Sequence, residues 1–136
     1  MSPEDNVKIV QEMYSAFLRR DVPGILVHLD DGVVWIVPGS SAVPMAGVRK
    51  GLTEVRQFFE TVEKMLEFRL FEPREYIAQG NRVVTLVRYE GRNKSTGREF
   101  SADSAMVWTV QNGKAIAFQE YTDTEAFANT SVAAVS

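Results

Sequence analysis

The sequence of 136 residues contains no cysteine and a single histidine, His28. The lack of cysteine excludes disulfide bonds, thiolate catalysis and cysteine-ligated metals, although a cysteine-free chain folds in either redox compartment. His28 lies in a stretch predicted to form a short helix, where a structural role is expected over catalysis. No group of His, Asp and Glu has the spacing of a metal site, and no glycine-rich loop leads from a strand into a helix. We therefore expect neither a metal nor another cofactor.

Concentrated charge and long apolar runs are also missing. The 15 Lys and Arg and the 18 Asp and Glu are scattered and leave a formal net charge of −3, so no basic surface is predicted for nucleic acid or an anionic membrane. No run approaches the roughly 20 apolar residues that span a bilayer, and the first residues, MSPEDNVK, do not resemble a signal peptide. We expect a soluble, cytoplasmic protein with one domain over residues 1–136, in which residues 130–136 form a fraying tail.

Helix signals dominate the first half of the chain. Ser2 supplies a hydroxyl cap, Pro3 suits the first helical position, and acidic side chains follow at the positive end of the helix dipole. Apolar residues then recur at helical spacing. Four helices are predicted, at residues 2–20, 21–29, from 51 onward and 124–129. Each range begins with the residue expected to cap or open the helix.

The second half of the chain has the alternation typical of antiparallel strands. Asn112-Gly113 indicates a hairpin, because both central residues of a type I′ turn need positive φ. The stretch Pro38–Gly47 holds two prolines and two glycines and is predicted as a loop that could form a lid. Strands are predicted at residues 33–37, 68–79, 82–90 and on both sides of the turn within 96–127. Helices followed by antiparallel strands indicate an α+β fold with helices on one sheet face.

Alternation along the last hairpin places one carboxylate among apolar side chains. The shared face is predicted to carry Ala102, Ser104, Met106, Trp108, Ile116, Phe118 and Glu120. Because an isolated buried charge is costly, Glu120 is expected either at the open mouth of a pocket or buried with a partner. Glu120 is therefore the central candidate residue.

The predicted strand at residues 82–90 is largely apolar on both faces. One face holds Val84, Leu86, Arg88 and Glu90, and the other holds Val83, Thr85, Val87 and Tyr89. A sheet with one wet face alternates clearly, so we expect both faces of this strand to be covered. A second copy of the chain is the simplest cover. We predict a homodimer formed through Val83, Val87, Val107 and Trp35, with Tyr121 nearby.

The order of these elements and the ending QEYTD resemble the nuclear transport factor 2 superfamily. Within it, the segments VVWIVPGS, KGLTEVRQFF and AMVWTVQNGKAIAFQEYTDTEAF look like the SnoaL-like polyketide cyclase group. The resemblance covers residues 5–127 and implies a cone-shaped, curved antiparallel (mixed) sheet wrapped around three helices. Because this fold hosts isomerases, cyclases, dehydratases, hydrolases and binding modules, the resemblance leaves the reaction open.

Limonene epoxide hydrolase, an enzyme of this fold, offers one comparison by residue. Its Arg-x-Asp pair and its last-strand aspartate are matched by Arg88, Glu90 and Glu120, with glutamate in place of both aspartates. Val34 and Ile36 stand where that family holds its water with a tyrosine and an asparagine. The resemblance implies carboxylate and guanidinium chemistry without a well-held nucleophilic water.

Ketosteroid isomerase, an enzyme whose carboxyl pKa values are set by the surroundings of each carboxyl group, offers a second comparison. Its helical tyrosine is matched by Tyr14, whereas Ile36 and Met106 replace its two aspartates. The resemblance therefore implies that Tyr14 can donate a hydrogen bond to a substrate oxygen. Packing in a helical core is the alternative role for this tyrosine.

These observations predict a cofactor-free enzyme that performs acid–base chemistry on a small, largely apolar, polyketide- or terpenoid-like molecule. Glu120 would be the acid or base, Arg88 would orient it, Glu90 would complete the relay, and Tyr14 would assist. Isomerase, cyclase, lyase and epoxide hydrolase reactions all fit this set. The alternatives are a cross-strand salt bridge at these residues and a non-catalytic binding module. The predicted ligand-binding residues are Phe17, Val34, Ile36, Phe59, Val62, Leu86, Ser104, Met106, Trp108 and Phe118.

Overall fold

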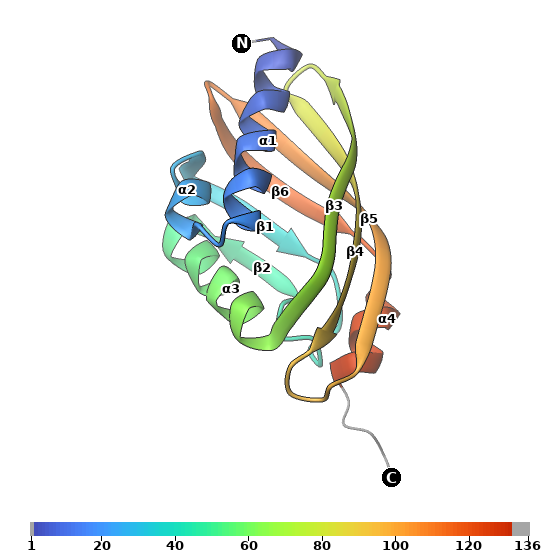
Figure 1. The fold of residues 1–136 in the computed structure, drawn as a ribbon. Helices are drawn as coiled ribbons and strands as arrows, with labels where there is room; N and C mark the ends of the chain where they lie inside the picture. Colours follow the sequence, from blue (N-terminus) through green and yellow to red (C-terminus); the bar gives the residue numbers. More distant parts are fainter. Residues whose placement is uncertain (1, 132–136) are drawn as a thin grey trace.

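The computed structural model describes residues 2–131. Four helices and six strands follow one another in this part of the chain (Figure 1). They are α1 (Pro3–Leu18), α2 (Val22–Leu26), β1 (Leu29–Val37), β2 (Gly47–Lys50), α3 (Gly51–Met65), β3 (Leu66–Gln79), β4 (Arg82–Asn93), β5 (Glu99–Gln111), β6 (Lys114–Tyr121) and α4 (Thr124–Ser131). The strands form one sheet in the order β2-β1-β6-β5-β4-β3, in which β1 runs parallel to β6 and every other neighbour is antiparallel.

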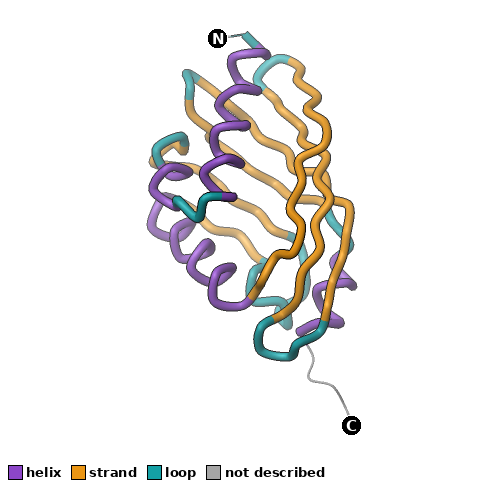
Figure 2. Tube along the Cα trace, viewed as in Figure 1, coloured by secondary structure: helices purple, strands orange, loops and turns teal. Residues whose placement is uncertain are grey.

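The sheet curves around the helices and does not close. Helix α1 packs on β3 and β4, whereas α3 packs on β1 and β2, so the two helices cover the concave face from opposite edges (Figure 2). Helix α4 packs on β5 and β4 at the end of the sheet nearer the C-terminus. The prediction of an α+β fold with a curved mixed sheet wrapped around helices is confirmed.

The caps predicted for the first two helices are confirmed. Ser2 and Asp5 form a capping box, in which each side chain accepts a hydrogen bond of 3.1 Å from the other residue's backbone N–H. The Asp21 side chain caps α2 by accepting a 3.0 Å bond from Gly24 N. Helix α2 ends at Leu26, so the prediction that it reaches residue 29 is wrong. Leu29 already belongs to β1, and its backbone pairs with Ala115 of β6.

Two features of the first strands differ from the predictions. Strand β1 starts at Leu29, four residues earlier than predicted, and its pairing with β6 shifts register between Leu29 and Val34. Strand β2 was not predicted, because four largely exposed residues at a sheet edge show neither an apolar run nor an alternation. The predicted loop at residues 38–47 therefore ends one residue earlier, where Gly47 enters β2.

The long strands extend beyond their predicted ends. Strand β3 follows α3 directly from Leu66, and β4 continues to Asn93, three residues beyond its predicted end, so the connection to β5 spans residues 94–98. Gly91 permits this extension, since a Cβ atom there would lie 2.2 Å from the Glu67 carbonyl oxygen of β3. The hairpin between β5 and β6 is confirmed, with φ of 53° at Asn112 and 81° at Gly113.

The inner face of β4 is the opposite of the face predicted for the site. Val87 pairs with Ser104 and Tyr89 pairs with Ala102, so the odd-numbered residues of β4 share the concave face with Ser104 and Met106 of β5. The even-numbered residues Val84, Leu86, Arg88 and Glu90 lie on the convex outer face. Strand β1 is reversed in the same way, because Val33, Trp35 and Val37 are buried while Val34 and Ile36 are partly exposed.

These reversals also correct the predicted dimer surface. Val83, Val87 and Trp35 are 0, 2 and 3 % exposed and belong to the core of their own chain. Ile116 also leaves the predicted inner stripe, since a register shift between Thr109 and Val110 pairs the fully buried Ala115 with Val110. The common cause is that a slip of one residue exchanges the two faces of a strand.

Helix α4 extends two residues beyond its predicted end at residue 129. Helix α4 includes Thr130, which is buried and whose carbonyl oxygen accepts a 2.6 Å hydrogen bond from the Thr96 hydroxyl. The remainder of the predicted tail, residues 132–136, lies outside the described residues. Within residues 2–131, no helix combines the length and hydropathy that crossing a bilayer requires.

Candidate active site

A cavity of about 100 Å³ lies between the helices and the concave face of the sheet. Its wall is largely aromatic and aliphatic, and it includes most of the residues predicted for the site. The predicted residues that line it are Tyr14, Phe17, Phe59, Val62, Met106, Trp108, Phe118 and Glu120. Val34, Ile36 and Leu86 do not line it, because they lie on the outer face.

Glu120 is the carboxylate of this cavity and is only 8 % exposed. Its Oε2 atom accepts hydrogen bonds of 2.9 Å from Tyr89 Oη and of 2.9 Å from Ser104 Oγ. Burial raises the pKa of Glu120 above its ordinary value, and the hydrogen bonds from Ser104 and Tyr89 oppose part of that rise. Ser104 does not line the cavity itself, so it acts on the site through its hydrogen bond to Glu120.

The second carboxylate oxygen of Glu120 is left for the cavity. No residue in the described range donates a hydrogen bond to Oε1. Within the same range, the fully buried side-chain nitrogen and oxygen atoms without a hydrogen-bond partner are Trp35 Nε1 and Thr85 Oγ1. Glu120 Oε1 is not among them, so it is not fully enclosed by protein atoms. Glu120 therefore has one oxygen held by two hydroxyls and one oxygen open to a bound molecule.

Tyr89 connects Glu120 to a third hydroxyl. Because the single phenolic proton of Tyr89 goes to Glu120, the hydrogen bond between Tyr89 Oη and Thr122 Oγ1 must be donated by Thr122. Burial, followed by the nearby Glu120 carboxylate, raises the pKa of Tyr89 well above its ordinary value. Tyr89 therefore stays protonated at neutral pH and acts here as a donor.

The second polar group of the cavity is the hydroxyl of Tyr14. It accepts a 3.1 Å bond from Trp108 Nε1 and donates one of 3.2 Å to Met106 Sδ. Burial raises the pKa of Tyr14 well above its ordinary value, so the group is a neutral donor. A thioether is a weak acceptor, and a substrate oxygen in its place would be a stronger one. Met106 also pairs with Glu120 across β5 and β6, which brings both polar groups to the same wall.

The prediction that Arg88 and Glu90 converge on Glu120 is wrong. Arg88 forms ion pairs of 3.3 Å with Glu90 and 3.6 Å with Asp103 on the convex face. Glu90 also accepts a 2.9 Å bond from Arg69, and Arg69 followed by Arg88 lowers the pKa of Glu90. The cross-strand salt bridge considered as the alternative is thus present, but it does not include Glu120.

Trp35, predicted for the dimer surface, is part of the aromatic wall of the cavity. Its ring stacks on Phe118 with centroids 4.0 Å apart, and Trp108 meets Phe118 edge-on at 4.6 Å. Such ring pairs stabilise beyond the area that they bury. A flat, apolar group fits a wall made of these ring faces and edges.

The loop at residues 38–46 covers part of the cavity, with Val43 and Met45 buried against it. Arg49 holds this loop by donating hydrogen bonds of 2.7 Å to the Met45 carbonyl and 3.0 Å to the Pro44 carbonyl. The Arg49 guanidinium also lies 4.9 Å from the ring centroid of Phe58, which lines the cavity. The loop that was predicted as a lid thus covers part of the cavity, and it is held by the Arg49 hydrogen bonds together with the buried Val43 and Met45.

Two polar residues that line the cavity, Tyr89 and Thr122, were missed. The signal for Tyr89 was available, since it is the neighbour of the chosen Arg88 and Glu90 on the same strand. Choosing the other face of β4 would have placed Tyr89 opposite Ala102 and beside Ser104. Within residues 2–131 there is no group of three or more His, Cys, Asp and Glu side chains that could hold a metal ion.

The chain belongs to the SnoaL-like domain family, whose model matches residues 10–118. It is also similar to solved structures over nearly its whole length. A nuclear transport factor 2-like (NTF2-like) protein from Burkholderia xenovorans LB400 is 35 % identical, with a TM-score of 0.90, covering 97 % of this chain and 99 % of that one. An NTF2-like protein of unknown function from Burkholderia pseudomallei K96243 is 34 % identical, with a TM-score of 0.87, covering 98 % of this chain and 100 % of that one.

A third similar structure was obtained together with a small organic compound. TerC, co-crystallized with polyporic acid, is 29 % identical to the chain, with a TM-score of 0.84, and the match covers 93 % of this chain and 98 % of TerC. No curated protein matches the chain. The fold of the chain is therefore that of the NTF2-like proteins, in agreement with the resemblance noted in its sequence.

Proposed function

We propose that the protein is a cofactor-free enzyme that carries out acid–base chemistry on a small, largely apolar molecule of the polyketide or terpenoid type. The observation that supports this most directly is Glu120, a buried carboxylate with one oxygen held by Tyr89 and Ser104 and the other left to the cavity. A carboxyl whose pKa is raised by burial is suited to proton transfer near neutral pH.

In the proposed reaction, the ionised Glu120 removes a proton from a carbon next to a carbonyl group of the substrate. The C–H bonding electrons form an enolate, and the proton moves to Oε1. Tyr14 donates a hydrogen bond to the developing oxyanion, in place of its bond to Met106 Sδ. Protonation of the enolate at another carbon gives an isomer, attack on a second carbonyl gives a ring, and loss of a leaving group gives an alkene.

Tyr89 and Ser104 have a positioning role in this proposal. Both donate to the same carboxylate oxygen, so they stabilise the ionised form of Glu120 and hold Oε1 toward the cavity. The epoxide hydrolase reaction is not retained, since Arg88 and Glu90 lie on the outer face. The similarity to TerC, which was co-crystallized with polyporic acid, supports a small organic ligand for this chain.

Solvent deuterium exchange tests the proposal without knowledge of the natural substrate. A panel of small cyclic ketones and 1,3-dicarbonyl compounds is incubated with the protein in D₂O, and loss of the α-proton signal is followed by NMR. Exchange that requires Glu120 supports the enzyme. Binding of these compounds with no exchange by the wild-type protein identifies a non-catalytic binding module instead.

We also propose that two copies of the chain pair through the convex face of the sheet. Leu86 is 36 % exposed and Tyr121 is 55 % exposed on this face, and Val107 lies between their strands. Of the residues predicted for the dimer, Val107 and Tyr121 lie outside the core, whereas Val83, Val87 and Trp35 are already covered.

A further inference from the structure

A groove of about 840 Å³ lies outside the cavity, between the C-terminal end of α1, α3 and the start of β3. The cavity itself, at about 100 Å³, is smaller than the roughly 300–1,000 Å³ of sites that enclose a whole drug-sized molecule. The two spaces are adjacent, because seven residues line both of them. These are Phe17, Ile25, Phe59, Val62, Leu66, Phe68 and Phe71.

Four phenylalanine rings form the partition between the two spaces. Phe17 is its centre, with ring centroids 4.8 Å from Phe71, 6.0 Å from Phe68 and 6.1 Å from Phe59. A register shift in β3 between residues 68 and 70 allows Phe68 and Phe71 to lie opposite Gly91 and Tyr89 on the same inner face. Because Phe17 contacts the other three rings and lines both spaces, rotation of its side chain would change how far the cavity and the groove communicate.

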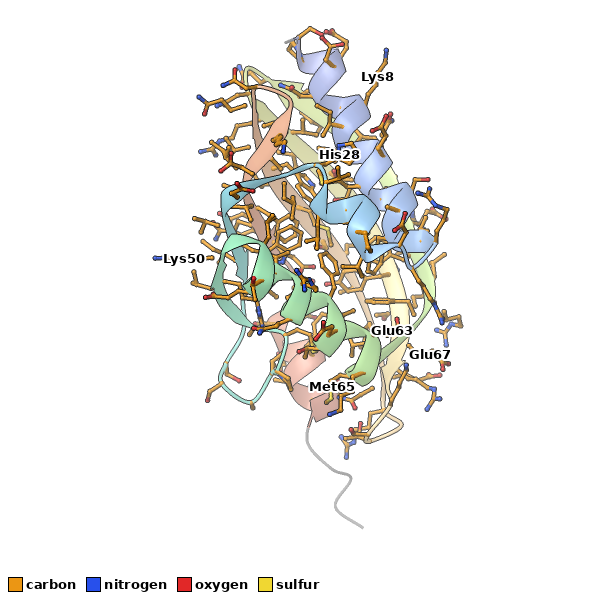
Figure 3. The ribbon with its side chains drawn as sticks, turned by 90° about the vertical axis from the view of Figure 1, so that its left-hand side faces the viewer. Lys8, His28, Lys50, Glu63, Met65 and Glu67 are labelled. Atoms are coloured by element: carbon orange, nitrogen blue, oxygen red, sulfur yellow. The ribbon has the colours of Figure 1, made fainter. Side chains whose placement is uncertain are left out.

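The rim of the groove is polar and has no excess of either charge. Its cations are Arg20, Lys64, Arg69 and Lys94, and its anions are Asp21, Glu60, Glu63 and Glu67. Arg20 and Glu63 form a 3.7 Å ion pair that joins the end of α1 to α3. Glu63 lies near the end of α3 and Glu67 at the start of β3, where the helix passes into the strand (Figure 3). A charged ligand would be attracted by one set of rim side chains and repelled to a similar extent by the other. Hydroxyl groups of a neutral ligand can form hydrogen bonds with both the cationic and the anionic side chains.

We propose that the cavity and the groove are one elongated ligand site, in which Phe17 sets how far a ligand extends. Its ligand is an amphipathic molecule with a ring-sized apolar end in the cavity and a neutral, hydroxylated or glycosidic end in the groove. The inference rests on the proposed function only in placing the reacting end beside Glu120. The substrate of this site is therefore a molecule too large for the cavity alone.

Phenol and phenyl β-D-glucoside are the probes that test this site. They share the ring, and only the glucoside has a group that reaches the groove. Trp35 and Trp108 both line the cavity, so their fluorescence reports binding of the ring. We expect the wild-type protein to bind the glucoside at least about fivefold more tightly than phenol. We expect the joint replacement Glu60→Ala and Lys64→Ala to remove that difference while leaving phenol binding unchanged.

Phe17→Ala tests the partition directly. It is expected to raise the association rate of the glucoside by about tenfold or more, because the ring no longer has to move aside. Phe17→Leu serves if the alanine variant does not fold. Lys8→Ala is the matched control, since Lys8 also lies on α1 but points into solvent and does not line the groove (Figure 3). Equal affinities for both probes, or a glucoside association rate unchanged in the Phe17 variants, would overturn the elongated site.

The two proposals fail in different ways. If the glucoside uses both spaces but no ketone exchanges its α-proton, the elongated site stands and the enzyme does not. If Glu120-dependent exchange occurs and the groove variants bind both probes like the wild type, the enzyme stands and the elongated site does not.

Discussion

Tyr89 donates a 2.9 Å hydrogen bond to Glu120 across an intervening strand, since Tyr89 is on β4, Glu120 is on β6 and β5 lies between them. Ser104 of β5 donates to the same carboxylate oxygen, so three neighbouring strands converge on one atom. This arrangement holds a buried carboxylate by hydroxyl groups instead of a cation. The proton affinity of Glu120 is therefore raised by burial without being lowered by an ion pair.

Replacement of Glu120 by Gln tests the proposed proton transfer. The variant keeps the shape of the side chain and removes its titrating group, so Glu120-dependent exchange should fall by roughly 10²–10⁴, with ligand binding nearly intact. Glu90→Gln is the matched control, because Glu90 lies on the outer face and pairs with Arg69 and Arg88. A Glu120→Gln protein with more than about a third of the wild-type exchange rate would show that Glu120 is structural.

Replacement of Tyr89 by Phe should shift the pH dependence. The hydrogen bond from Tyr89 stabilises the ionised Glu120 and lowers its pKa, so its removal should raise that pKa further. The acid limb of a base-catalysed exchange profile should then move to higher pH, and the ¹³C signal of the Glu120 carboxyl should titrate at higher pH. Ser104→Ala should shift both in the same direction. A profile that loses amplitude without moving would indicate that Tyr89 only packs.

The stability of the protein should also depend on Glu120 and pH. Its pKa is raised in the folded state, so its contribution to stability is fully present below the unfolded-state value and is lost as pH rises through the folded-state value. Glu120→Gln has no such loss. Its Tm relative to the wild type should therefore increase from acidic pH to above the folded-state pKa, as measured by calorimetry. A Tm difference that does not change with pH would contradict the raised pKa.

Replacement of Arg49 by Ala should loosen the loop over the cavity. It removes two hydrogen bonds to loop carbonyls and the contact with Phe58, together worth about 1–3 kcal/mol. Amide exchange in residues 38–46 should become faster, while exchange in the central strands changes much less. Lys50→Ala is the control, because Lys50 points into solvent beside Arg49 (Figure 3). Equal exchange in both variants would mean that the loop is held by Val43 and Met45 alone.

Replacement of Leu86 by Asp should disrupt the proposed dimer. Light scattering of the wild-type protein should give about twice the chain mass of 15.3 kDa. A charge on the convex face should lower that mass toward one chain, because an unpaired buried charge opposes association. Leu18→Asp, at an exposed position on the helix side, should leave it unchanged. A wild-type monomer at micromolar concentration would contradict the proposal.

Much of the fold could be predicted from local sequence signals. The capping box at Ser2, the cap at Asp21 and the turn at Asn112-Gly113 each depend on a few neighbouring residues, and all three are present. Glu120 was found for a similar reason, since a tight turn sets the register of its hairpin and alternation then places its side chain. Strand β2 carried no comparable signal, because its place depends on pairing with β1 and packing against α3.

The partners of Glu120 were decided by the tertiary structure. Strand β4 is apolar on both faces, so its own pattern does not tell which face turns inward. The inward face is set by the register between β4 and β5, which are joined by residues 94–98. The end of β4 was predicted three residues too early, and a register error of one residue is enough to place Arg88 inside instead of Tyr89. The sequence alone determined the helices, the last hairpin and the carboxylate of the site. Only the pairing of distant strands determined that hydroxyl groups, and not a guanidinium, surround it, because side-chain direction in a sheet has a period of two and does not survive a slip of one.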